Sequence, residues 1–224
     1  MNKEIIPTQR SSLLRRNGSQ ELIIEVEDKK YKDLFLINGS DFITEDIAES
    51  DLIIKPNSYY MVINNGIKQI NINYNQDISR HNIIYNPYKF EFSKKIILDR
   101  YFFEDKYEIP EGYIDVLPKW YSFKFIYPDY NLIFVRPEFG ISIQIHYYRK
   151  EFWEILKGEP IVINENKIYY FVKEGTKFQS SINTFHSIIN ANKEENTFIM
   201  IKEKWSGDFH ENDIKRVFNP NHYL

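Results

Sequence analysis

ISIQIHYYRKEFWEILKG, residues 141–158, is the stretch of sequence that decides the fold. With a period of two, isoleucines fall on one face of its first half and polar residues on the other, which predicts a strand with an apolar back and a polar front. The polar face carries Ser142, Gln144, His146 and Tyr148. Glu151 follows, so the pattern Gln-x-His-x-x-x-x-Glu offers oxygen and nitrogen donors that suit a borderline divalent metal ion. His186 lies far enough along the chain for one hairpin and a returning strand to bring it to the same face.

The composition narrows the class of protein. The 224 residues include no cysteine, which excludes disulfides, thiolate nucleophiles and cysteine metal sites. The net charge of −3 gives no basic surface for nucleic acid, so the expected partner is a small molecule. No segment reaches about 18 consecutive apolar residues, and the N-terminus lacks the apolar run of a signal peptide. We therefore expect a soluble, cytoplasmic protein that does not bind a membrane.

An all-β fold is expected from the residue types. The chain is rich in isoleucine and contains 17 Tyr and 17 Phe, whereas Ala48 and Ala191 are its only alanines. Aromatic and β-branched residues suit a pleated sheet, and alanine is the strongest helix former.

The first half of the chain alternates short apolar runs with turn residues. Residues 1–20 are polar and predict a loose arm or a segment that docks on a neighbour. Beyond them, apolar runs bounded by Asn, Gly, Asp or Pro predict the strands of a sandwich or barrel. These runs are residues 21–26, 34–37, 52–54, 59–63 and 67–74, with further strand candidates at 89–92 and 95–103. Turns at Pro110 and Pro118 predict a border between a β-rich domain, 21–111, and a second domain, 112–224.

The second half has a more regular pattern of strands and turns. The predicted strands are residues 120–125, 132–135, 141–146, 151–156, 185–190 and 197–205, with a hairpin over 161–172 and a tail over 206–224.

This half resembles a known family. The strings that carry the resemblance are SIQIHYYRKEFWEILKGEPIV (142–162), FHSIIN (185–190) and WSGDFHENDIKR (205–216), together with the turn at Gly175. They resemble the cupin domain of type II mannose-6-phosphate isomerases, over about residues 119–216. The family's two motifs correspond to Gln144, His146, Arg149, Glu151, Trp153 and Gly158, and to Gly175, His186 and Asn190.

The resemblance implies a cupin double-stranded β-helix, a jelly-roll barrel, over 112–224, with a divalent metal at its mouth. The implied ligands are Gln144, His146, Glu151 and His186. Type I mannose-6-phosphate isomerases, which are similar cupins, hold zinc on one Gln, two His and one Glu. Zinc is therefore the expected metal, with Fe, Mn and Ni as alternatives. For residues 21–111 we favour a degenerate second cupin, giving a bicupin, over an elaboration wrapped on a single barrel.

Some positions depart from the family's pattern. Tyr147 and Tyr148 stand where the family has histidines, and Phe152 replaces another common histidine. Ser181 and Asn183 replace the Pro and Gly of the second motif. The four implied ligands are kept, so the departures concern the catalytic machinery.

The implied activity is isomerisation of a sugar phosphate, in carbohydrate or nucleotide-sugar metabolism. Such a reaction needs a metal to polarise a carbonyl, a base to move a proton between adjacent carbons, and a cation for the phosphate. The candidates for the base are Glu203, Lys202 and Tyr148, whose phenol the strand pattern points into the barrel. The candidates for binding a sugar or sugar phosphate are Arg149 and Arg216, whose guanidinium groups match anionic oxygens, and Trp153, which could stack on a sugar ring.

Structural interpretations remain open for the same residues. Glu151 could be a strand-edge carboxylate paired with Arg149 or Lys150, and His81 is interpreted as structural or exposed. The aromatic residues could form core or a subunit surface, which makes a homodimer the expected assembly. The functional alternatives are a cupin that binds a carbohydrate or a partner without chemistry and, less favoured, a metal-dependent oxygenase.

Overall fold

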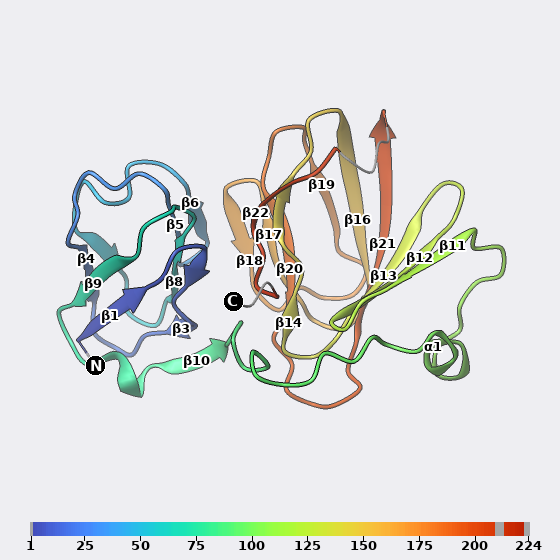
Figure 1. The fold of residues 1–224 in the computed structure, drawn as a ribbon, viewed down its shortest axis with the longest axis horizontal. Helices are drawn as coiled ribbons and strands as arrows, with labels where there is room; N and C mark the ends of the chain where they lie inside the picture. The colour runs from blue at the N-terminus through green and yellow to red at the C-terminus, as the bar shows by residue number, and fades with distance from the viewer. Residues whose placement is uncertain (1, 209–212, 222–224) are drawn as a thin grey trace. The chain divides into compact units, whose positions relative to one another are not determined.

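The computed structural model describes residues 2–208 and 213–221 (Figure 1). Within them the fold is nearly all β, with one α-helix and one short 3-10 helix, so the all-β prediction is confirmed. The chain divides into two compact units: residues up to 86 together with 166–168, and residues 87–165 together with those from 169 on. This division assigns 87–111 to the second unit, whereas the turns predicted a border at 111–112. No helix in the described part of the chain combines the length and apolar character needed to cross a membrane.

The first unit consists of short antiparallel strands around one apolar core. Its strands are ordered β1-β9-β4-β7 in one sheet and β10-β3-β8-β5-β6 in another. The alternation of ININY in β9 buries its two isoleucines and its tyrosine and leaves the asparagines outward, as the sequence predicts. The elements are β1 (Lys3–Ile6), β2 (Arg10–Ser11), β3 (Leu14–Arg16), β4 (Leu22–Val26), β5 (Leu34–Asn38), β6 (Asp41–Ile43), β7 (Leu52–Ile54), β8 (Tyr59–Asn64), β9 (Ile70–Tyr74), η1 (Ile78–Arg80) and β10 (Asn82–Tyr85).

The N-terminal segment is part of this unit, and the prediction of a loose arm over 1–20 is wrong. Strands β1, β2 and β3 pair with β9 and β8. Ile6 and Leu14 are almost completely buried in the described structure. The burial of these two apolar side chains, together with the backbone hydrogen bonds of the three strands, holds this largely polar segment in place.

The second unit is built from two antiparallel sheets that share a core. The six-stranded sheet has the order β11-β12-β13-β21-β16-β19, which can be followed in Figure 1, and the other has the order β17-β20-β15-β22. Trp153 and Ile201 from the first pack in one cluster with Val162 and Ile188 from the second. The remaining elements of the chain are α1 (Arg100–Lys106), β11 (Asp115–Pro118), β12 (Ser122–Ile126), β13 (Asn131–Val135), β14 (Phe139–Gly140), β15 (Ile143–Ile145), β16 (Arg149–Lys157), β17 (Ile161–Asn164), β18 (Lys167–Tyr169), β19 (Lys177–Ser180), β20 (His186–Asn190), β21 (Ile199–Gly207) and β22 (Lys215–Phe218).

The predicted strands at 89–92 and 95–103 are also wrong. No strand forms there, and residues 100–106 are helix α1. The Asp99 side chain caps this helix by accepting a hydrogen bond from the Tyr101 backbone N–H at 2.8 Å. Phe103 is the buried residue of the helix, packed within an aromatic cluster of the second unit. A helix this short depends on its cap and on tertiary packing, which the buried Phe103 provides, and alternation in the sequence does not report either of them.

Candidate metal centre

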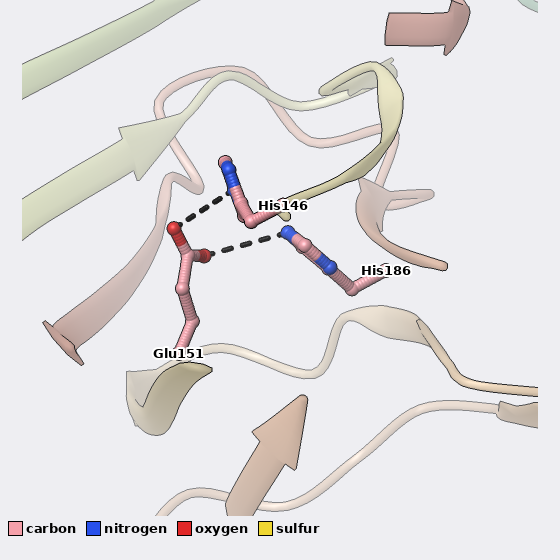
Figure 2. Close-up of side chains that lie close together, drawn as sticks. All are labelled: His146, Glu151 and His186. Carbon is pink, nitrogen blue, oxygen red and sulfur yellow. Dashed lines mark ion pairs between the residues drawn. The ribbon is translucent and has the colours of Figure 1, made fainter. Parts of the chain in front are cut away.

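His146, Glu151 and His186 converge in the interior of the second unit. Their ligand atoms all lie within 4.8 Å of one another, and all three residues are buried. Glu151 projects from β16, and its carboxylate points between the two imidazole rings, as Figure 2 shows. Oε1 lies 3.0 Å from Nε2 of His146, and Oε2 lies 3.4 Å from Nε2 of His186. These spacings are close to the edge of a tetrahedron of zinc ligands, which is about 3.3 Å for bonds of 2.0–2.1 Å.

Gln144 joins the cluster from β15. Its backbone is paired with His186 of β20, and its side-chain Nε2 lies 3.3 Å from Nε2 of that histidine. The hydroxyl of Ser142 donates to Oε1 of Gln144 at 3.2 Å. A half-turn of the amide exchanges its nitrogen and oxygen, which would present Oε1 to the centre. The structure thus brings together the four residues that the resemblance implied as ligands.

The orientation of His146 leaves one ring nitrogen facing the centre. Its Nδ1 contacts the backbone carbonyl of Asp213, and a carbonyl can only accept, so Nδ1 carries the proton. Nε2 therefore presents its lone pair toward Glu151. Metal-binding histidines commonly have this second hydrogen bond to a carbonyl, which fixes the ring and its tautomer.

Glu151 has the electrostatics of a cation ligand. Burial alone would raise the pKa of this carboxyl group. When the rings of His146 and His186 are protonated, their N–H groups and positive charge lower the pKa well below the ordinary value, so Glu151 is the member of the cluster that gives up its proton. Its Oε2 is buried and makes no hydrogen bond of good geometry. A buried, ionised carboxylate is costly unless a cation is near. The Arg149 guanidinium contacts Oε1, whereas Oε2 is left over, and with the two imidazoles this donor set fits a divalent metal ion.

Asp213 is a residue of this centre that the sequence patterns did not single out. Its buried carboxylate accepts hydrogen bonds from the backbone N–H groups of Tyr147, at 2.8 Å, and Tyr148, at 3.1 Å. It thereby fixes the turn between β15 and β16 that places His146. The available signal was the string WSGDFHENDIKR, in which Asp213 stands, but nothing within that string indicates which residue turns inward.

The Asp213 carboxylate also forms a buried ion pair, with Oδ2 lying 3.8 Å from Nη1 of Arg149. We expect Asp213→Ala to lower the free energy of unfolding of the second unit by about 3–5 kcal/mol, the usual cost of removing one partner from such a pair. Asp213→Asn keeps one acceptor oxygen and should cost clearly less. Urea unfolding followed by circular dichroism measures both variants. Equal stability of the alanine variant and the wild type would contradict the role given to this carboxylate.

A small cavity adjoins the centre. Its volume is about 120 Å³, and Gln144, Arg149 and Glu151 form part of its wall. Glu203 of β21 lines it as well, with Oε1 accepting hydrogen bonds from Lys124 Nζ at 3.1 Å and from Asn131 Nδ2 at 2.7 Å. The exposed residues Lys119 and Arg216 complete the charged lining. The cavity therefore combines two carboxylates with four cationic side chains.

The other predicted site residues fall in different places. Glu203 and Arg216 line the cavity, whereas Lys202 points to the opposite face of β21, where its Nζ lies 4.4 Å from the ring centroid of Tyr130. Tyr148 is 66% exposed, so the expectation that it points into the barrel is wrong. The strand alternation breaks at residues 146–148, because β15 ends at Ile145 and β16 begins at Arg149.

Trp153 and Arg149 are both buried. The indole of Trp153 packs edge-on against the His186 ring, with ring centroids 5.2 Å apart, and only 3% of the residue is exposed. This position supports the metal centre and leaves no ring face for a sugar. Arg149 directs its donors to Glu151, His146 and Asp213.

The two facing antiparallel sheets, with this donor set between them, define a jelly-roll barrel of the cupin class. Residues 109–219 match the family model described as mannose-6-phosphate isomerase C-terminal, and this part of the chain is a cupin domain of that family. The resemblance inferred from the sequence is thus confirmed.

The similarities to solved structures are weaker, and three of them follow. An oxalate oxidase in complex with glycolate is 22% identical, with a TM-score of 0.34, over 39% of this chain and 45% of the oxidase. The cupin domain of Cnp3 from Schizosaccharomyces pombe is 13% identical, with a TM-score of 0.35, over 42% of this chain and 69% of that domain. A protein from Acidithiobacillus ferrooxidans assigned as a sugar phosphate isomerase is 17% identical, with a TM-score of 0.32, over 46% and 64% of the two chains. This chain therefore spans less than half of the oxidase. No curated protein matches the sequence.

Proposed function

We propose that the protein is a metal-dependent isomerase of a sugar phosphate. The observation that carries the proposal is the convergence of Gln144, His146, Glu151 and His186 beside a cavity lined by Glu203 and several cationic side chains. Membership of residues 109–219 in the mannose-6-phosphate isomerase C-terminal family supports it.

The four converging residues would hold the metal, for which zinc is the first candidate. A divalent ion bound there supplies a Lewis acid that polarises a carbonyl oxygen. The role of the protein itself is to hold these donors close together before a metal ion binds. The hydrogen bond from His146 to the Asp213 carbonyl does this for one ligand, and the backbone pairing of Gln144 with His186 does it for two others.

Glu203 is the best-placed base among the candidates. It is buried, it lines the same cavity as Glu151, and Lys124 and Asn131 fix its Oε1. In an aldose–ketose isomerisation, a carboxylate takes the proton from the carbon next to the carbonyl and returns it to the former carbonyl carbon. The hydroxyl proton on the first carbon passes to the former carbonyl oxygen, so no atom is lost or gained. Lys202, on the opposite face of the strand, is not placed for this role.

The phosphate is assigned to the exposed part of the cavity lining. Arg216 and Lys119 are both exposed there, and a guanidinium offers two parallel donors to phosphate oxygens. The cavity's volume of about 120 Å³ is below the roughly 300–1,000 Å³ of ordinary ligand pockets. A hexose phosphate would therefore place only its reacting end inside.

The small cavity also favours a second candidate function, a cupin that binds a carbohydrate or a partner without catalysing a reaction. An assay of the interconversion of mannose 6-phosphate and fructose 6-phosphate separates the two, using the full chain loaded with zinc. Activity supports the isomerase. Silence on a panel of sugar phosphates, from a protein that holds its metal, overturns it in favour of the binder.

If the protein is an isomerase, Glu203→Gln should lower kcat by about 10²–10⁴-fold, the usual contribution of a general base. Lys204→Gln is the matched control, since Lys204 is exposed on the same strand and lies outside the cavity lining. Its kcat should stay within about threefold of the wild type, as for surface changes away from a site. Equal losses in both variants would contradict the assignment of Glu203.

A further inference from the structure

Arg149 places a cation inside the candidate metal centre. The residue is 7% exposed, and its guanidinium makes contacts on several sides. Nε donates to Oε1 of Glu151 at 2.9 Å, and Nη2 lies 3.1 Å from Nε2 of His146. Nη1 donates to the backbone carbonyl of Asp213 at 3.3 Å. The same guanidinium thus bridges two of the four candidate ligands.

The chemistry of these groups fixes the direction of the His146 contact. A guanidinium has only donors, so Nη2 must donate and Nε2 of His146 must accept through its lone pair. This agrees with the proton on Nδ1, which faces the Asp213 carbonyl. Nε2 of His146 and Oε1 of Glu151 are then two acceptors only 3.0 Å apart. Such a pair needs a shared cation, and Arg149 supplies one.

A metal ion would use the same lone pair. Imidazole binds a metal through an unprotonated nitrogen, and Nδ1 of His146 is committed to the carbonyl. The lone pair of Nε2 can serve either the Nη2–H of Arg149 or a metal ion. The positive guanidinium beside Glu151 also repels a divalent cation, and the screening of that repulsion is weak in a buried site.

We propose that Arg149 is a built-in competitor of the metal ion, which weakens metal binding and requires Nη2 to leave His146 whenever a metal is bound. The inference rests on the proposed metal centre, and it assigns Arg149 to the regulation of metal affinity instead of to phosphate binding. It predicts that the centre gains affinity when the guanidinium is removed, the opposite of what a supporting residue would give.

Zinc affinity of purified variants of the full chain tests this inference. The dissociation constant is measured by competition with a chromogenic chelator, at a fixed pH, for the wild type and Arg149→Met. Methionine keeps much of the length and the apolar contacts of arginine and has no donor. The zinc Kd should fall by about tenfold or more, since a hydrogen bond from a charged donor no longer competes.

Two further variants make the result specific. Lys119→Met removes an equal charge from the same cavity lining without touching His146, and its zinc Kd should stay within about threefold of the wild type. Arg149→Lys keeps the charge but loses the planar fork that spans both ligands, so its Kd should also fall, by a smaller factor. If the methionine variant fails to fold, as judged by circular dichroism, the lysine variant carries the test.

The outcomes separate this inference from the proposed function. Weaker or unchanged zinc binding in the Arg149 variants, with a wild type that binds zinc, overturns the competition alone and leaves the metal centre standing. Failure of the wild type and of every variant to bind zinc overturns the metal centre as well. Tighter binding in the Arg149 variants but not in Lys119→Met supports the competition.

Discussion

His186→Ala is expected to remove the bound metal from the purified protein almost completely. The wild type should retain about one equivalent of divalent metal, and the variant less than about a tenth of an equivalent. The reason is geometric: Nε2 of His186 lies 3.4 Å from Glu151 and 3.3 Å from the Gln144 amide, so its loss removes a donor that faces both. Mass spectrometry of the metals in the purified protein, expressed without chelators, measures the effect.

The matched control is His81→Ala. This histidine of the first unit contacts the Tyr60 hydroxyl through Nδ1 at 2.6 Å, and it lies outside the cluster of candidate ligands. Its loss should leave the metal content unchanged, while circular dichroism checks that both variants fold. A His186→Ala protein with wild-type metal content would contradict the site, and so would a wild type with less than about a tenth of an equivalent.

Gly207→Ala is expected to lower the free energy of unfolding by about 2–5 kcal/mol. Gly207 has φ of +103° and pairs with Arg149 at the end of β21. An added Cβ would lie 2.5 Å from the carbonyl oxygen of Tyr148 and 3.3 Å from Cα of Arg149. Both neighbours are backbone atoms, so relief requires moving the turn that carries His146, and metal affinity should fall as well. Thermal or urea unfolding measures the stability.

Gly175→Ala separates the cost of the backbone conformation from that of the contact. Gly175 also has a positive φ, +80°, but nothing lies within 4 Å of the position that an alanine methyl would occupy. Its substitution should cost about 1–2 kcal/mol and leave metal affinity unchanged. Equal effects of the two substitutions on stability and on metal binding would show that the backbone of the turn at 146–148 is free to move.

The strand β16 shows what periodicity could predict. Its residues alternate between buried and exposed, so that Arg149, Glu151 and Trp153 turn inward while Lys150 and Phe152 turn outward. Alternation is a local property of the pleated backbone, and one sequence is enough to assign the two faces. The same alternation places Glu203 and Lys202 on opposite faces of β21. Which of the two faces lines the cavity was decided by the packing of β21 in the domain, and it is the face with Glu203.

Periodicity failed where the backbone leaves the strand. Extending the alternation through residues 146–148 pointed Tyr148 inward, but a turn held by Asp213 interrupts it. Asp213 is brought there because β22 pairs with β15, although the two strands lie far apart in the sequence. The periodicity of either segment does not indicate which distant strand it pairs with, so the position of Asp213 could not be predicted from it.

The sequence by itself determined the all-β class and, through the family's motifs, the four candidate ligands, because strand propensity, turn residues and motif spacing are local. Only the tertiary structure decided that these donors meet 3.0–3.4 Å apart, that Arg149 bridges two of them, and that Asp213 from the tail fixes the turn beside them. Such distances result from strand pairing and from the packing of two sheets, which depend on the whole domain at once.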